Sequence, residues 1–268
     1  MKTGQPIGIF DSGIGGLTVL RELKKLLPNE SFVYVGDTAH VPYGNKSNDS
    51  IIKFSKKLTS FLVEQHDVKL VIIACNTASS IVINDLNKSF SVPFIDVISP
   101  LKSYLLKPNN EFIQNIGVIG THNTISSNTY NKFLKETNIN FKIFSKACPL
   151  FVPIIEEGLA DHEVSKIIIA EYLDSLMNNK IHALILGCTH YPILLNQISS
   201  YLGKDVKIIN SAYVVASYTK EYLNENAEQN QALPTTKLYL TDESQHFNMF
   251  ATKFLNNDFD YIKKINLF

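Results

Sequence analysis

The sequence predicts an α/β protein whose parallel strands are covered by helices. Short apolar runs alternate with amphipathic stretches along the whole chain, and small or polar clusters follow these runs. Two similar cysteine-containing turns, far apart in sequence, suggest two related halves. With 268 residues and 45% hydrophobic content, the chain is long enough for one large or two smaller domains.

The apolar runs are predicted to be buried strands, because each is short and ends at a turn-forming cluster. Residues 51–62 and 169–176 carry apolar side chains at helical spacing. Strands that alternate with helices in this way favour parallel sheets covered on both faces. The predicted strands are residues 7–10, 32–35, 70–74, 116–119, 183–186 and 206–209.

Two cysteines follow strands in near-matching turns, Cys75 within residues 73–77 and Cys188 within residues 186–190. A thiol at the amino terminus of a helix has a lowered pKa, so both sulfurs are expected to be usable bases. If both turns meet in one cleft, one sulfur removes a proton from a substrate carbon and the other adds one to the opposite face. The alternative is packing, because free cysteines are commonly buried.

Composition excludes several classes of protein. Lys+Arg 25 balance Asp+Glu 25, so no net field favours nucleic acid or an anionic membrane. No apolar stretch reaches the roughly 18 residues of a membrane helix, and no signal peptide is recognised, so a cytoplasmic protein is expected. The three cysteines are not expected to form disulfides, and their spacing does not fit a structural zinc site.

Residues 13–16 form a glycine turn after the first predicted strand. A phosphate-binding turn is one interpretation, although the spacing departs from GxGxxG and Asp11 would repel phosphate. In the second interpretation the glycines let Asp11 and Ser12 point into a cleft. In the third, Asp11 caps the following helix.

The second cysteine turn places His190 two residues after Cys188, where an imidazole can share a proton with sulfur. A Cys-His hydrolase uses the same pair, but it leaves Cys75 without a role. Cys148 has no polar turn of this kind and is interpreted as structural. Short neutral donors that suit a small carboxylate substrate better than phosphate are Asn76, Thr77, Thr121, Thr124 and Thr189.

Four blocks in this order carry a resemblance to a known family: residues 10–17, 36–44, 74–78 and 186–192. Together they resemble the bacterial glutamate racemases of the cofactor-independent aspartate/glutamate racemase superfamily. The resemblance implies two pseudo-symmetric α/β domains, residues 1–97 plus 210–268 and residues 98–209, with the active site in the cleft between them. It implies interconversion of L- and D-glutamate for peptidoglycan synthesis, with no cofactor or metal, in a homodimer.

The resemblance also implies roles for individual residues. Cys75 and Cys188 would be the acid/base thiols, assisted by Asp11 and His190, and Glu156 would be a further acid near the cleft. The substrate's amino and α-carboxylate groups would be held by Ser12, Asn76, Thr77 and Thr189, and its side-chain carboxylate by Pro42, Tyr43, Gly44, Thr121 and Thr124.

Two positions depart from the family pattern: His40 stands where many members carry Arg, and Asn210 where an acidic residue is common. Two alternatives to glutamate racemisation stay open. One is a racemase of aspartate or another small acid, and the other is a non-catalytic amino-acid-binding protein.

Overall fold

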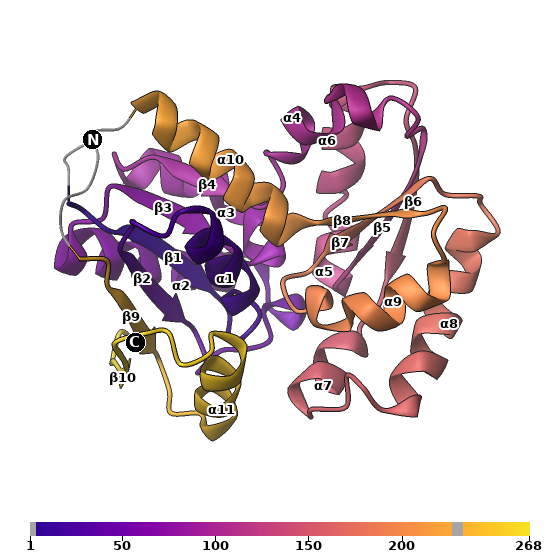
Figure 1. The fold of residues 1–268 in the computed structure, drawn as a ribbon. Coiled ribbons are helices and arrows are strands. Elements are labelled where there is room, and N and C mark those ends of the chain that lie inside the picture. The colour runs from indigo at the N-terminus through magenta and orange to yellow at the C-terminus, as the bar shows by residue number, and fades with distance from the viewer. Residues whose placement is uncertain (1–3, 227–232) are drawn as a thin grey trace.

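The computed structural model describes residues 4–226 and 233–268 and contains two parallel sheets, each with helices on both faces (Figure 1). The larger sheet has the order β10-β9-β2-β1-β3-β4, and the smaller has the order β6-β5-β7-β8. All strand pairs among the described residues are parallel. The predicted fold class is confirmed.

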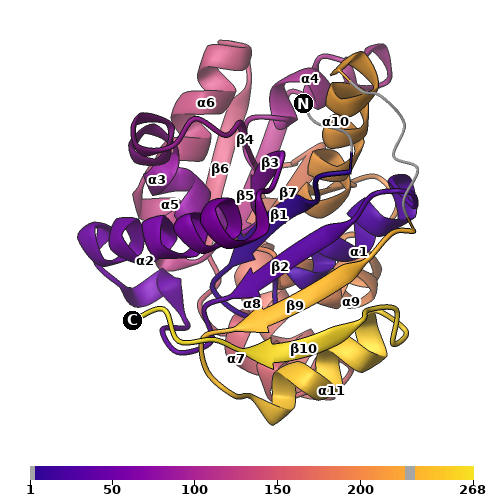
Figure 2. The ribbon, with the colours of Figure 1, turned by 90° about the vertical axis from the view of Figure 1, so that its left-hand side faces the viewer.

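Figure 2 turns the larger sheet toward the viewer, with β10 at one edge and β4 at the other. The strands of the larger sheet are β1 (Ile7–Asp11), β2 (Phe32–Gly36), β3 (Leu70–Ile73), β4 (Phe94–Asp96), β9 (Thr236–Leu240) and β10 (Tyr261–Lys264). Those of the smaller sheet are β5 (Asn115–Gly120), β6 (Lys142–Ala147), β7 (Ala183–Gly187) and β8 (Lys207–Asn210).

The longer helices cover the sheets, and short helical turns connect them. The α-helices are α1 (Leu17–Leu26), α2 (Asn48–Ser60), α3 (Asn76–Ser89), α4 (Leu101–Leu105), α5 (His122–Ser126), α6 (Thr129–Thr137), α7 (Phe151–Glu156), α8 (Glu163–Met177), α9 (Leu195–Leu202), α10 (Ser211–Asn226) and α11 (Gln245–Phe254). The short turns are η1 (Tyr43–Asn45), η2 (Phe61–Gln65), η3 (Pro108–Asn110) and η4 (Tyr191–Leu194).

Side chains that alternate along each strand build a separate core on each face of the sheet. In β1, Ile7 and Ile9 pack with α1, α10 and α11, whereas Phe10 packs with α2 and α3. In the smaller sheet, Leu184 faces α7, α8 and α9, whereas Ile185 faces α4 and α6. Each strand therefore needs apolar residues on both faces, which explains the continuous apolar runs in the sequence.

All six predicted strands overlap observed ones, and both helical stretches lie in observed helices. Four strands were not predicted: β4, β6, β9 and β10. Three of these are edge strands. β4 has only 3 residues, β6 is mostly half-buried and β10 is largely exposed, so none of the three carries a long apolar run.

The parallel register places the ends of neighbouring strands together. In the larger sheet Asp11 pairs with Gly36, and Phe10 pairs with Ile73. In the smaller sheet Gly120 pairs with Gly187. The segments that follow these strands, including Ser12 and Cys188, are therefore collected at the carboxyl edges of the two sheets.

Candidate active site

The segments at the two carboxyl edges enclose one small cavity of about 20 Å³, enough for roughly one water molecule. Both Cys75 and Cys188 line it. They come from different sheets, so the cavity lies between the two halves. The lining residues are Ser12, Val41, Pro42, Tyr43, Gly44, Cys75, Asn76, Thr77, Thr121, Val152, Cys188, Thr189 and His190.

Cys75 is the N-cap residue of α3 and is 5% exposed. Its Sγ lies 3.7 Å from Ser12 Oγ, to which it donates a hydrogen bond. Burial, reinforced by the negative charge of Asp11, raises the pKa of Cys75 to about 12, against opposing contributions from the Ala78 N–H and Ser12. The expected lowering at this helix terminus is therefore wrong for Cys75, because desolvation of the thiolate outweighs the helix donors.

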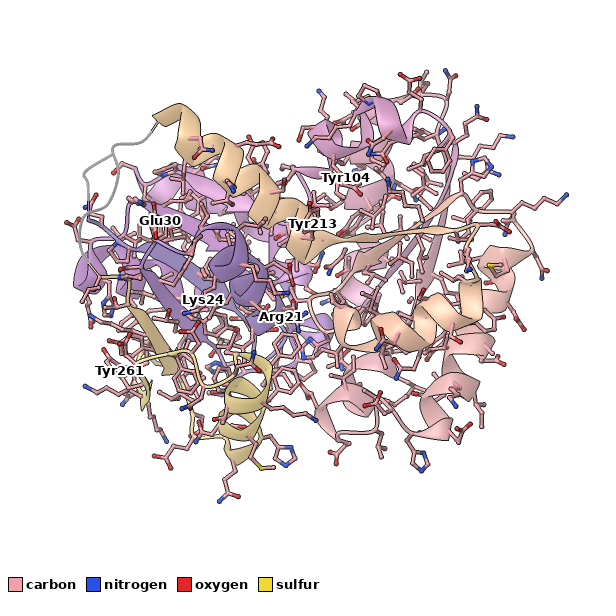
Figure 3. All side chains as sticks on the ribbon, viewed as in Figure 1. Arg21, Lys24, Glu30, Tyr104, Tyr213 and Tyr261 are labelled. Carbon is pink, nitrogen blue, oxygen red and sulfur yellow. The ribbon has the colours of Figure 1, made fainter. Side chains whose placement is uncertain are left out.

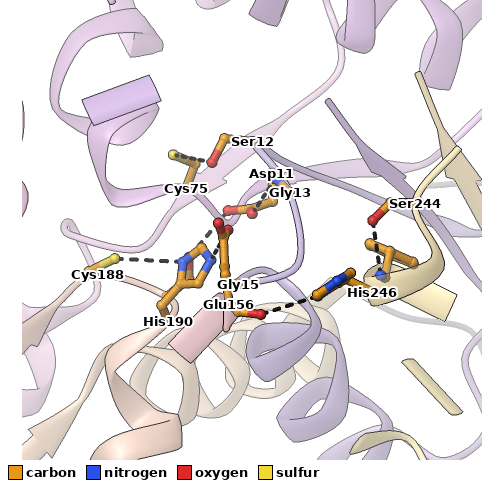
Figure 4. Close-up of polar contacts among 12 residues, drawn as sticks. Asp11, Ser12, Gly13, Gly15, Cys75, Glu156, Cys188, His190, Ser244 and His246 are labelled. Atoms are coloured by element: carbon orange, nitrogen blue, oxygen red, sulfur yellow. Dashed lines mark hydrogen bonds and ion pairs between the residues drawn. The ribbon is translucent and has the colours of Figure 1, made fainter. Parts of the chain in front are cut away.

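Cys188 is 7% exposed, and the helical stretch that follows it begins with the 3-10 turn η4, whose N-cap is His190, and continues directly into α9. Its Sγ lies 3.8 Å from His190 Nδ1, and His190 Nε2 lies 3.1 Å from Glu156 Oε1 (Figure 4). Burial lowers the pKa of His190, but its bonds to Cys188 and Glu156 outweigh this effect and raise the pKa to about 10. At neutral pH a cationic imidazole therefore lies beside Cys188.

Asp11 is fully buried between the two cysteine turns. Its Oδ2 accepts the N–H of Gly13, and its Oδ1 accepts Thr189 Oγ1 from the other half. Burial raises the pKa of Asp11, while the cationic His190 and these donors oppose the rise. The carboxylate thus shapes the glycine turn and joins the two halves, and α1 begins at Leu17 after the N-cap residue Gly16, which has no side-chain cap bond.

The glycine turn is packed against the second cysteine turn. A Cβ atom on Gly15 would lie 2.4 Å from His190 Nδ1, which no real contact allows. Glycine at this position therefore lets the loop after β1 approach the imidazole. The space that a phosphate-binding turn would need is filled by His190 and Thr189, which argues against the nucleotide-site interpretation.

Three hydroxyl groups meet across the interface of the two halves. Thr77 Oγ1 lies 3.0 Å from Thr121 Oγ1 and 3.2 Å from Thr124 Oγ1. Asn76 donates from Nδ2 to Tyr130 Oη at 2.8 Å, and its buried Oδ1 has no partner among the described residues. The cavity wall therefore offers neutral donors and one free acceptor to a small polar molecule.

Most of the predicted site residues line the cavity, and three lie behind the lining. Asp11, Glu156 and Thr124 contact lining residues instead of the cavity itself. Sequence reasoning missed Val41 and Val152, whose aliphatic side chains carry no chemical signal. It also assigned no role to Tyr130, which reaches the site through Asn76, a contact distant in sequence, or to Asp37, which lies six residues before its partner Tyr43.

Cys148 is fully buried outside the cavity, where it packs with the core between the smaller sheet and α8. The two departures from the family pattern make local contacts. Asn210 Oδ1 accepts the N–H of Ala212 at the start of α10, and His40 Nδ1 lies 2.8 Å from Asp37 Oδ1.

A larger cavity of about 300 Å³ lies at the opposite, amino-terminal edge of the larger sheet. Its charged side chains already have partners: Lys24 pairs with Asp258, Glu30 pairs with Lys69, and Asp260 Oδ2 accepts the N–H of Thr236 (Figure 3 labels Lys24 and Glu30). In the described part of the chain, no cluster of three His, Cys, Asp or Glu residues could hold a metal ion, and no helix is long and apolar enough to span a bilayer.

Comparison with known proteins gives consistent results. The sequence profile of the Asp/Glu/Hydantoin racemase family matches residues 7–219. A glutamate racemase of Sulfurihydrogenibium sp. is 44% identical over 91% of each chain, and one of Chlorobaculum parvum is 42% identical over 100% of this chain and 98% of its own.

Solved structures agree over nearly the full length. A glutamate racemase isoform of Bacillus anthracis superposes with a TM-score of 0.93 at 34% identity and covers 99% of both chains. The Francisella tularensis glutamate racemase in complex with D-glutamate has a TM-score of 0.90 at 38% identity and covers 98% of both chains. The chain therefore belongs to the Asp/Glu/Hydantoin racemase family and is an amino-acid racemase, as its four motifs indicated.

Proposed function

We propose that this chain interconverts L- and D-glutamate without a cofactor, with Cys75 and Cys188 as its two acid/base groups. The observation that carries the proposal is the cavity that both sulfurs line, each from its own half. Two bases on opposite sides of one small space suit inversion at a single carbon. A hydrolase with Cys188 and His190 alone would leave Cys75 in this cavity without a task.

The proton balance follows from the two thiols. A thiolate on one side removes the α-proton of glutamate, and the thiol on the other side donates its own proton to the opposite face. The protonation states are then exchanged, so each form of the enzyme accepts one enantiomer. Hydroxyl and amide donors around the cavity stabilise the negative charge that spreads into the α-carboxylate during the step.

The remaining lining residues, together with Thr124 behind them, suit the two ends of glutamate. Ser12, Asn76, Thr77 and Thr189 would hold the amino and α-carboxylate groups, and the unpartnered Asn76 Oδ1 is a suitable acceptor for the ammonium. The side-chain carboxylate would be received by Pro42, Tyr43, Gly44, Thr121 and Thr124.

In this conformation of the protein, the cavity is too small to hold an amino acid. A volume of about 20 Å³ holds roughly one water, so glutamate enters only if the halves separate or the lining moves. Closure around the substrate would then expel water and strengthen each polar contact.

The biological setting is part of the proposal. D-glutamate from this enzyme would supply peptidoglycan synthesis in the cytoplasm, and the active form would be a homodimer. The two domains would comprise residues 1–97 plus 210–268 and residues 98–209. These boundaries are supported by the sheet order, because the chain leaves the larger sheet after β4 and returns after β8.

The test is circular dichroism of L-glutamate incubated with the purified enzyme and no added cofactor. We expect the signal to decay to zero as the racemic mixture forms. L-Aspartate assayed in parallel distinguishes a glutamate racemase from an aspartate racemase. If the circular dichroism signal decays with aspartate and not with glutamate, glutamate is not the substrate. In deuterated water, product should acquire solvent label at the α-carbon before unreacted substrate does, and equal early labelling of both would contradict two single-proton bases.

A further inference from the structure

The turn that carries Tyr43 is anchored by one buried carboxylate. Asp37, directly after β2, is fully buried and accepts three side-chain hydrogen bonds. Tyr43 Oη donates to its Oδ2 at 2.7 Å, while Thr241 Oγ1 at 2.7 Å and His40 Nδ1 at 2.8 Å both contact its Oδ1. Since an ionised carboxylate only accepts, His40 carries its hydrogen on Nδ1.

The His40 ring is held from two sides by aromatic side chains. Phe54 of α2 stacks on it with ring centroids 4.1 Å apart, and Phe268 meets it edge-on at 4.5 Å. The rings of Phe54 and Phe268 also contact each other, at 5.4 Å. Ile265 and Leu267, next to Phe268 in sequence, pack against the core that contains Tyr43. The imidazole is thereby fixed in the orientation that Asp37 needs.

The anchored turn forms the wall of the cavity that faces the second half. Asn123 of α5 donates from Nδ2 to the carbonyl oxygens of Tyr43 and Lys46, at 3.2 and 2.8 Å. A Cβ on Gly44 would lie 3.0 Å from Thr121 Cβ, so the backbone of the turn already meets the opposite wall. A small shift of this turn would therefore change the fit of anything bound between Gly44 and Thr121.

We propose that His40, packed against Phe54 and Phe268, is a positioning residue that orients Asp37 and through it Tyr43, and so sets the affinity for glutamate without touching it. The inference rests on the proposed function, in which the Tyr43 turn receives the substrate's side-chain carboxylate. Neither the proton carriers nor their partners contact His40, so binding is affected and the chemical step is not.

The experiment compares three variants by calorimetric titration with D-glutamate and by steady-state kinetics. His40→Phe keeps a ring between Phe54 and Phe268 but removes the donor to Asp37, and we expect Kd and KM to rise about tenfold with kcat changed less than about twofold. His40→Asn places an amide N–H near the position of Nδ1 and should recover part of the affinity. Phe268→Ala should raise Kd and KM about threefold.

The matched control is Phe112→Ala, which removes an exposed phenyl ring from the other half and should change nothing. Circular dichroism checks that each variant folds. If His40→Phe does not fold, the effect of Phe268→Ala on Kd and KM tests the proposal. Unchanged Kd and KM in the folded variants, or a loss confined to kcat, would overturn the role of His40 and leave the proposed function intact. A wild-type chain that neither binds nor racemises glutamate would overturn the proposed function as well.

Discussion

The turns at Cys75 and Cys188 are near-copies in sequence and differ in their surroundings. Cys75 caps a long helix and lies beside the Ser12 hydroxyl and the negative field of Asp11. Cys188 precedes a short turn and lies beside His190, which Glu156 supports. The two sulfurs are almost equally buried, at 5% and 7% exposure, so burial does not distinguish them.

The difference between the turns is one of charge. Burial and the negative charge of Asp11 raise the pKa of Cys75 to about 12, whereas the group beside Cys188 is the imidazole of His190, whose pKa is raised to about 10. Two positions that are equivalent in sequence thus have neighbours of opposite charge. A racemase needs such a difference, because one base must begin ionised and the other protonated.

The largest expected effect tests whether both turns are needed. Cys75→Ser and Cys188→Ser should each lower racemisation on the order of a thousandfold or more, because a serine hydroxyl is not ionised near neutral pH. Cys148→Ser, at a buried site outside the cavity, is the control and should keep its activity if it folds. Near-normal turnover in either of the first two variants would contradict the two-thiol assignment.

The next effect tests whether His190 serves one turn only. His190→Asn should lower kcat about a hundredfold by removing the cation beside Cys188. Because the two enantiomers have equal free energy, kcat/KM is the same for L- and D-glutamate in any variant. An unequal effect of His190→Asn on the two directions therefore has to be measured by another quantity. We expect the primary deuterium isotope effect on kcat to change for one enantiomer, and equal changes for both would argue against a local role.

The pH dependence of stability separates the turns further. His190 has a pKa raised from 6.5 to about 10, so its stabilisation is complete below pH 6.5 and is lost as the pH rises toward 10. The free energy of unfolding should fall by up to about 1.4 kcal/mol per pH unit in this range.

Cys75, with a pKa raised from 9.0 to about 12, also loses stabilisation with rising pH, but only above about pH 9. Urea unfolding between pH 6.5 and 9 therefore isolates the second turn. His190→Asn should flatten this part of the profile, and an unchanged slope would show that His190 is not the group involved.

Alkylation compares the two sulfurs directly. Because thiolates react and thiols do not, the raised pKa of Cys75 should protect it from iodoacetamide at pH 7.5 without substrate, and we expect Cys188 to be modified about tenfold faster. Peptide mapping by mass spectrometry follows both rates in one sample, with the buried Cys148 as an internal reference. Faster modification of Cys75 than of Cys188 would contradict the raised pKa of Cys75.

The smallest effect concerns the support behind His190. Glu156→Gln keeps a hydrogen-bond acceptor but removes the negative charge 3.1 Å from Nε2, and it should lower kcat about fivefold, since this carboxylate is partly exposed. Glu157→Gln, one residue further and exposed, is the matched control. If both substitutions lower kcat equally, the overall negative charge of this surface is responsible, and the Glu156–His190 contact is not.

The sequence by itself determined the features that depend on local pattern. Apolar runs predicted every central strand of both sheets except β9, and residues at strand ends predicted most of the cavity lining, because each signal lies within a few neighbouring residues. The blocks around Cys75 and Cys188 also gave the family. The edge strands β6 and β10 were not predicted, because a strand with little buried surface has few apolar residues.

Tertiary structure alone decided the electrostatics and the support of the site. The raised pKa of Cys75, the His190–Glu156 contact and the Asp37–Thr241 contact all depend on burial or on neighbours brought together by folding. Residue 76 meets residue 130, and residue 37 meets residue 241, only once both sheets have formed. Desolvation and long-range contact belong to the whole fold, and so a local sequence motif cannot specify them.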